Sequence, residues 1–335
     1  MQTALAVFVY NRPAHTDSLL RSLARCRGLE RVQLHFFCDG AKRYTDRDRV
    51  RKVRSLTDHF LANHPGFKVE QDENKGLAAS IIEGVSRLLD QFESAIVLED
   101  DLVLNADFLS YHLAALQRYR SEDAVLQISG SNFERASAPS SRCFFLPFIS
   151  TWGWSTWKRA WSRFEPDEIR RHPPVLTGEV RRAFDVGGTY PYSRMFEYAL
   201  RGNNSSWGAL WNWHVFSQGG AVLYPARSLI YNTGFDGSGV HCGRSSDDSW
   251  QADLESLTEE FDFGRWTFPD AVGVNDNDLA RARVALSDVR MKQRKSSPKA
   301  QAGSKLFGNI RRFFFGYPSR QGGLRNEGQR PPVEP

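Results

Sequence analysis

Three consecutive acidic residues, Glu99, Asp100 and Asp101, directly follow an apolar run in this chain of 335 residues. Carboxylates this close together at the end of a buried strand repel one another, which costs stability unless a cation lies among them. Hard divalent cations prefer oxygen ligands and bind carboxylates and diphosphates together. The segment therefore predicts a divalent metal site. A solvated acidic loop, or the cap of the following helix, is the alternative.

Three other short segments have polar residues suited to an anionic ligand. Tyr10-Asn11-Arg12 and Cys38-Asp39-Gly40 each follow an apolar run, and Asn74-Lys75-Gly76 precedes a helical pattern. The first amides of a helix, together with an arginine or lysine side chain, can receive a diphosphate. Simple turns, and a helix cap at Asn74, are the alternative for each segment.

Strands and helices must alternate to position these segments. Apolar runs at 4–10, 32–38, 67–70, 95–98 and 124–128 are separated by patterns with helical spacing. This alternation predicts an α/β, Rossmann-like fold with a mainly parallel central sheet and helices on both faces. Ligands of such sheets bind at the carboxyl ends of the strands, where all four polar segments fall.

The acidic segment resembles the Glu-Asp-Asp motif of A-type (GT-A fold) nucleotide-sugar glycosyltransferases, in particular N-acetylglucosaminyltransferase I and its relatives. The similarity spans roughly residues 4–245 and is strongest at about 95–132. The chain also resembles bacterial family-2-like sugar transferases, with which it shares the Trp-rich segment 151–157 and the Gly-rich segment Asn232–Cys242.

The resemblance implies a metal-dependent hexosyl- or N-acetylhexosaminyltransferase. It would move a sugar from a nucleotide-sugar donor, expected to be a UDP-sugar, to a hydroxyl of a glycan or lipid-linked glycan, with inversion. The cofactor would be Mn²⁺ or Mg²⁺, which bridges the two phosphates and neutralises the departing diphosphate.

Site roles also follow from the resemblance. Asp101 would bind the metal, and a late histidine, His241, would be a second ligand unless it is structural. The remaining candidates would hold the base, ribose and diphosphate of the donor: Asn11, Arg12, Asp39, Lys75, Glu99 and Asp100.

The general base is the least defined part of the predicted site. An inverting transferase needs a carboxylate or histidine near the acceptor hydroxyl. Where the resembled families have an aspartate, this chain has Gly208 and Ser205. Glu197 and Asp236 are the candidate bases. If neither serves, the enzyme is retaining or inactive, and a non-catalytic module that binds sugar nucleotides or glycans is the alternative function.

Tryptophans 152, 154 and 157 have a spacing that fits neither a regular helix nor a regular strand. Indole rings stack on the apolar faces of sugars, so these residues could form an acceptor platform. Packing in the core is the alternative.

The charge is unevenly distributed along the chain. Residues 290–335 hold 11 Lys and Arg against 2 Asp and Glu, whereas the preceding residues hold 33 against 37. An acidic body argues against nucleic-acid binding.

We expect one domain over residues 1–290, with a donor half at about 1–130 and an acceptor half at about 131–290. Residues 291–335 would be a basic, flexible tail, or alternatively a contact with an anionic membrane through Phe313–Phe315.

Two remaining features concern location and a rival activity. No apolar run is long enough to span a bilayer, the first strand lacks the features of a signal peptide, and the four cysteines lack metal-ligand spacing. These features predict a cytoplasmic protein, at most peripheral at the inner face of the membrane.

A sugar-phosphate nucleotidyltransferase would need a Gly-rich loop after the first strand, where Tyr10–Pro13 has no glycine.

Overall fold

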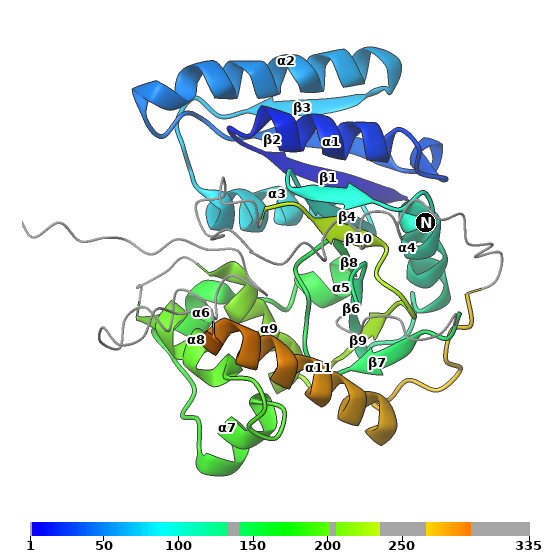
Figure 1. Ribbon diagram of the computed structural model, residues 1–335, viewed down its shortest axis with the longest axis vertical. Helices are drawn as coiled ribbons and strands as arrows, with labels where there is room; N and C mark the ends of the chain where they lie inside the picture. The colour runs from blue at the N-terminus through cyan, green and yellow to red at the C-terminus, as the bar shows by residue number, and fades with distance from the viewer. Residues whose placement is uncertain (1, 133–140, 202–205, 235–265, 296–335) are drawn as a thin grey trace, which may run out of the picture.

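The computed structural model describes residues 2–132, 141–201, 206–234 and 266–295, and its centre is an eight-stranded sheet (Figure 1). The strands of this sheet are, in chain order, β1 (Thr3–Val9), β2 (Gln33–Cys38), β3 (Gly66–Glu70), β4 (Ser94–Glu99), β6 (Val125–Ser129), β7 (Phe144–Leu146), β8 (Trp154–Trp157) and β9 (Ala221–Tyr224). Their spatial order is β3-β2-β1-β4-β8-β6-β9-β7.

The sheet is mainly parallel. Strands β3, β2, β1 and β4 pair in parallel, as do β6 and β9, whereas β8 and β7 are antiparallel to their neighbours. Strand β1 is buried along its whole length, which explains its continuous apolar sequence. The predicted α/β class, with a mainly parallel sheet, is confirmed.

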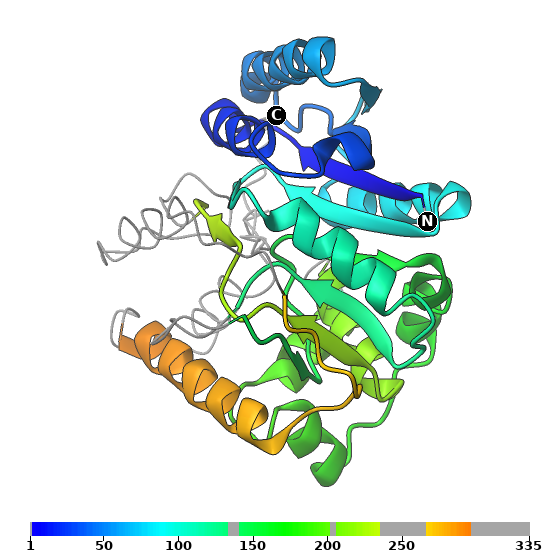
Figure 2. The ribbon, with the colours of Figure 1, turned by 90° about the vertical axis from the view of Figure 1, so that its right-hand side faces the viewer.

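Helices cover both faces of the sheet, as expected, and Figures 1 and 2 show the two layers. One face packs against α1 (Pro13–Leu23), α2 (Arg47–Asn63) and α4 (Phe108–Arg118). The other face packs against α3 (Leu77–Gln91), α5 (Lys158–Trp161), α9 (Trp207–Ser217) and α11 (Asp276–Lys295). Helix α8 (Tyr192–Leu200) packs on α9, and α7 (Gly178–Phe184) packs on α8. The remaining helices are α6 (Pro166–Arg171) and the short 3₁₀ turns η1 (Leu29–Arg31) and η2 (Tyr44–Asp46).

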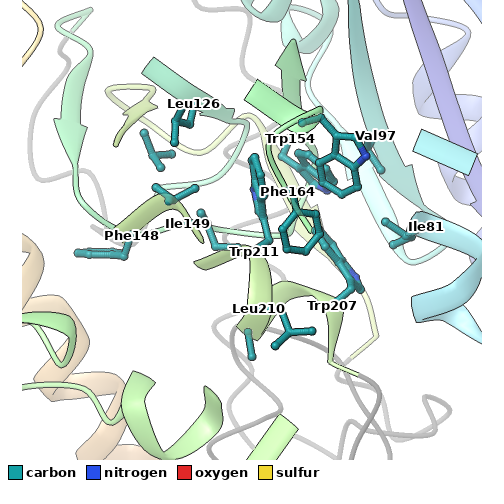
Figure 3. Close-up of a cluster of buried hydrophobic side chains, with 14 of the residues drawn as sticks. Ile81, Val97, Leu126, Phe148, Ile149, Trp154, Phe164, Trp207, Leu210 and Trp211 are labelled. Carbon is teal, nitrogen blue, oxygen red and sulfur yellow. The ribbon is translucent and has the colours of Figure 1, made fainter. Parts of the chain in front are cut away.

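Trp154 forms part of the core on the α3 side, whereas Trp157 of the same strand packs in the core on the α1 side. Trp154 of β8 stacks on Trp207 of α9, with 5.0 Å between ring centroids, and both side chains are buried. Trp211 lies beside them, as Figure 3 shows. Helix α9 is apolar around most of its circumference, as expected of a helix buried on all sides. Trp157 is buried as well. Trp154 and Trp157 therefore pack in the core and do not form the acceptor platform considered from the sequence. Trp152 is half-buried.

A second, two-stranded antiparallel sheet joins β5 (Leu102–Leu104) to β10 (Ile230–Asn232). It links the segment that follows the acidic residues to a segment more than a hundred residues later in the chain. This pairing was not predicted from the sequence.

Helix α11 packs along β7 and extends past the predicted domain boundary at residue 290. The remainder of the predicted tail lies outside the described residues. Among the described residues, no helix combines the length and apolar content needed to cross a bilayer. Cys26, Cys38 and Cys143 are free and buried.

Candidate functional site

The acidic residues lie where β4 leaves the sheet, next to the end of β1. Phe8 pairs with Glu99 in the register of these two strands, so the loop after β1 adjoins the acidic segment. Asp100 and Asp101 are buried, with exposed fractions of 4% and 8%, and Glu99 is half-buried. The carboxylates are thus packed against protein at the carboxyl edge of the sheet. A solvated acidic loop, the alternative interpretation, does not fit this burial.

Arg12 supplies a positive charge to this cluster. One guanidinium nitrogen, Nη2, pairs with Asp100 Oδ1, and the other, Nη1, donates to Asp101 Oδ2 at 3.1 Å. Asp100 also accepts a long hydrogen bond, 3.4 Å, from the backbone N–H of Tyr10. A cation does lie among the carboxylates, as the sequence required, and in this structure it is an arginine.

One guanidinium does not neutralise three carboxylates. Burial, reinforced by the charge of Asp101, raises the pKa of Glu99 well above its usual range. Burial also raises the pKa of Asp100, although the charge of Arg12 opposes that shift. Burial lowers the pKa of Arg12, but the charges of Asp100 and Asp101 outweigh it and raise the pKa overall. Both shifts disfavour the charged forms of Glu99 and Asp100, as expected where one guanidinium faces three crowded carboxylates.

The segment after β10 lies against Asp101. The backbone N–H and the hydroxyl of Thr233 donate to the carbonyl oxygen of Asp101 at 2.7 and 2.9 Å. A side-chain carbon at Gly234 would lie only 2.6 Å from Asp101 Oδ2. The Gly-rich segment predicted to carry site residues therefore begins at the acidic cluster. Asp236 and His241, the candidates within it, lie outside the described residues.

The loop after β1 is held by Asp46, which the sequence did not identify. Its carboxylate accepts hydrogen bonds from the hydroxyl of Tyr10 and the side-chain amide of Asn11, both at 3.1 Å. Arg49 pairs with the same carboxylate at 2.8 Å. An aspartate before a helical pattern indicates only a helix cap, so this contact could not be predicted from the sequence. Asn11 thus anchors the loop from which Arg12 projects.

Asp39 organises the neighbouring loop. Its two oxygens accept hydrogen bonds from the backbone N–H groups of Gly40, Lys75 and Gly76 and from the side chain of Asn74, at 2.8 to 2.9 Å. The side chain of Lys75 pairs with Glu83. Asp39, Lys75 and Glu83 line a cavity of about 120 Å³ at the ends of β2 and β3. The structure thus joins the predicted segments 38–40 and 74–76 through one buried carboxylate.

Glu197 lies on α8 and forms a short ion pair with Arg181 of α7. Within the described residues, its hydrogen bonds and ion pairs do not link it to Arg12 or to the acidic cluster.

The acidic cluster fits a divalent ion in charge and in oxygen chemistry. In the described ranges, no group of three His, Cys, Asp or Glu side chains is arranged to hold a metal ion. A magnesium-type site needs only one or two carboxylates, because phosphates and water complete the coordination. Asp101, beside the Gly-rich segment, could supply that carboxylate. These carboxylate oxygens thus fit a divalent ion that is bound together with a diphosphate.

Comparison with known proteins gives matches among solved structures only, since no protein-family model and no curated protein matches the chain. S. aureus TarS (residues 1–349) is 14% identical over 70% of this chain and 60% of its own, with a TM-score of 0.39. GalNAc-T7, crystallised with UDP, GalNAc and Mn²⁺, is 8% identical over 93% of this chain and 54% of its own, with a TM-score of 0.44. A cytidylyltransferase from Leptospira borgpetersenii is 10% identical over 50% of this chain and 65% of its own, with a TM-score of 0.32.

Glycosyltransferases are thus among the structures that the chain resembles, as the sequence resemblance implied. This chain spans between half and two thirds of the length of these three neighbours.

Proposed function

We propose that this chain is a metal-dependent glycosyltransferase that moves a sugar from a nucleotide-sugar, a UDP-sugar by resemblance, to a glycan or lipid-linked glycan hydroxyl with inversion. The observation that supports the proposal most directly is the buried acidic cluster at the end of β4, beside Arg12 at the end of β1. Carboxylates and a guanidinium at the carboxyl edge of a parallel sheet suit a nucleoside diphosphate and its cation.

Each group in the proposed site has a binding task. Asp101, with His241, would hold Mn²⁺ or Mg²⁺, while Glu99 and Asp100 would contact the ribose and support the site. Arg12 and Lys75 carry positive charge toward the diphosphate, and Asn11 and Asp39 hold the loops from which they project. A bound divalent ion would supply stabilisation of the negative charge that builds on the departing diphosphate.

Isothermal titration of UDP in the presence and absence of Mn²⁺ tests this proposal. Binding that requires Mn²⁺ in the wild type, and that falls at least tenfold in Asp101→Ala, is the expected result. The matched control is Asp48→Ala, which removes an exposed aspartate of α2 and should bind UDP as the wild type does. Equal affinity of Asp101→Ala and the wild type would contradict the proposal.

The general base is proposed to be Asp236 or Glu197. The ion pair with Arg181 engages the carboxylate of Glu197, so this residue would have to leave its partner to accept a proton from the acceptor hydroxyl. Steady-state transfer assays with Asp236→Asn and Glu197→Gln would identify the base as the variant that loses at least a hundredfold in kcat while keeping its affinity for UDP.

A non-catalytic binding module is the second candidate, and the engagement of Glu197 by Arg181 favours it. Such a module would bind UDP but would neither transfer sugar nor hydrolyse the donor. Release of UDP from UDP-sugars by the purified protein, measured with and without Mn²⁺, separates the two candidates. Metal-dependent release that is abolished in Asp101→Ala supports the enzyme.

Location is also part of the proposal. We propose that the protein is cytoplasmic and that residues 291–335 are either a flexible basic tail or a contact with anionic lipid at the inner face of the membrane. Flotation of the full-length protein with vesicles containing phosphatidylglycerol tests the contact, since recovery of the protein at the bottom of the gradient would exclude it.

A further inference from the structure

Arg12 occupies oxygens that a metal ion would need. Its two terminal nitrogens are shared between Asp100 and Asp101, and the Asp101 contact is made through Oδ2 at 3.1 Å. The Asp100 and Asp101 side chains are only 5% and 11% exposed, so water competes weakly for these contacts. A divalent ion at Asp101 would have to share the carboxylate with the guanidinium or displace it.

The backbone that carries Arg12 is held in place. Arg12 precedes Pro13 at the start of α1, and its carbonyl accepts hydrogen bonds from the backbone N–H and the hydroxyl of Thr16 at 2.9 and 3.0 Å. Asn11, the preceding residue, is tied to Asp46. Only the side chain of Arg12, which is 22% exposed, is able to move away from the carboxylates.

A diphosphate would give that side chain another partner. Guanidinium groups bind phosphates, like carboxylates, through two parallel hydrogen bonds. Without the diphosphate, an arriving cation meets a positive charge that is already bound to its ligands. With the diphosphate, the guanidinium would turn to the phosphates and leave Asp101 to the metal.

We propose that Arg12 is an internal counter-ion that makes metal binding depend on the nucleotide, so that the divalent ion enters only when a diphosphate has drawn the guanidinium away. This inference rests on the proposed function and adds an order of binding to it. Arg12 thus acts as the residue that selects the metal–diphosphate pair over either component alone.

Titration of Mn²⁺ followed by the electron paramagnetic resonance signal of the free ion tests the inference. In the wild type, we expect UDP to tighten Mn²⁺ binding at least tenfold, a difference of about 1.4 kcal/mol. Arg12→Gln should bind Mn²⁺ without UDP at least tenfold more tightly than the wild type does, and should lose most of the enhancement by UDP. Arg12→Lys keeps one charge without the two-pronged geometry and should fall between them.

Arg21→Gln is the matched control, because it removes an exposed arginine from α1, the helix that Arg12 precedes, and the ion pair of Arg21 is with Asp17. It should behave as the wild type. Circular dichroism establishes whether each variant is folded. If Arg12→Gln does not fold, the Mn²⁺ affinity of Arg12→Lys alone decides the test.

The outcomes separate the two proposals. Mn²⁺ binding in the wild type that is equally tight with and without UDP, or that does not tighten when Arg12 is replaced, overturns this inference and leaves the proposed function standing. No Mn²⁺ binding in any sample containing UDP overturns both.

Discussion

Asp39 and Asp101 are both aspartates at the end of a parallel strand, yet their carboxylates have different surroundings. Asp39 accepts four hydrogen bonds from its own loop and from the turn at residues 74–76, which leaves little capacity for a ligand. Asp101 accepts a hydrogen bond from one arginine and adjoins the Gly-rich segment. The first carboxylate holds its loop in place, and the second contacts the side chain of Arg12, which we propose moves away when a diphosphate binds.

Replacing Asp39 by asparagine should destabilise the protein. The amide nitrogen cannot accept the hydrogen bonds that one oxygen now receives, so we expect a loss of about 2 kcal/mol in the free energy of unfolding. Urea unfolding followed by circular dichroism measures the loss. Asp48→Asn, on an exposed aspartate, should change stability by less than about 0.5 kcal/mol. If the two variants are equally stable, Asp39 does not hold the loop.

At the scale of the elements, the sequence predicts the donor half closely and the rest poorly. The limits of β1, β2, β3, β4 and β6 can be predicted to within a residue or two. Strands β1, β4 and β6 are buried along nearly their whole length, which gives them mostly apolar sequences, whereas β3 lies at the edge of the sheet and is exposed or half-buried. Strand β8 could not be predicted, because its two outer residues are tryptophans whose spacing matches no regular pattern, and because it inserts between β4 and β6.

Pairing between strands far apart in the sequence explains why the contacts within the site could not be predicted. The sequence identified Arg12 and the acidic residues, but their contact depends on β1 and β4 being neighbours. In the same way, only the pairing of β5 with β10 brings Thr233 and Gly234 to Asp101. Periodicity reports the type of an element and not its partner, which explains why the residues were predicted and their contacts were not.

Replacing Trp154 by alanine tests the core assignment of β8. Loss of a buried indole that stacks on Trp207 should cost about 3–5 kcal/mol in the free energy of unfolding. Chemical denaturation measures it, with Val175→Ala, an exposed position, as the control. A stable Trp154→Ala protein that had lost only acceptor affinity would instead support the acceptor platform.

Replacing Gly234 by alanine tests the contact between the Gly-rich segment and the acidic cluster. The added methyl group would approach Asp101 Oδ2 to 2.6 Å, so the carboxylate or the segment must shift. We expect Mn²⁺-dependent UDP affinity to fall at least tenfold in isothermal titration. Gly178→Ala, where a methyl group would meet no neighbour within 4 Å, should leave the affinity unchanged. Equal affinities would show that the segment adapts without cost.

For the molecule as a whole, each of the two cores contains a buried histidine. His112 of α4 is fully buried on one side of the sheet, and burial lowers its pKa to about 3. His214 of α9 is buried on the other side, and burial lowers its pKa to about 4. The unfolded chain binds protons at these histidines near pH 6.5, whereas the folded protein does not. Stability is therefore full above about pH 6.5 and is lost as the pH falls toward these lower values.

Replacing His112 by glutamine should reduce this dependence on pH. For one histidine whose pKa falls from 6.5 to about 3, the loss in the free energy of unfolding between pH 7 and pH 5 is about 2 kcal/mol. Urea unfolding measures the free energy of unfolding at the two pH values. The difference between pH 7 and pH 5 should be smaller in the variant than in the wild type by that amount, whatever the absolute stability of the variant. His59→Gln, at an exposed position, is the control. Identical differences in all three proteins would mean that His112 does not contribute to acid sensitivity.

The most direct test of the proposed function is anomalous diffraction from crystals soaked with UDP and Mn²⁺. An anomalous peak within bonding distance of an Asp101 carboxylate oxygen is predicted, with the diphosphate beside it and the guanidinium of Arg12 turned from Asp101 toward the phosphates. A manganese peak or a nucleotide bound away from the ends of β1 and β4 would contradict the assignment of this edge of the sheet as the donor site.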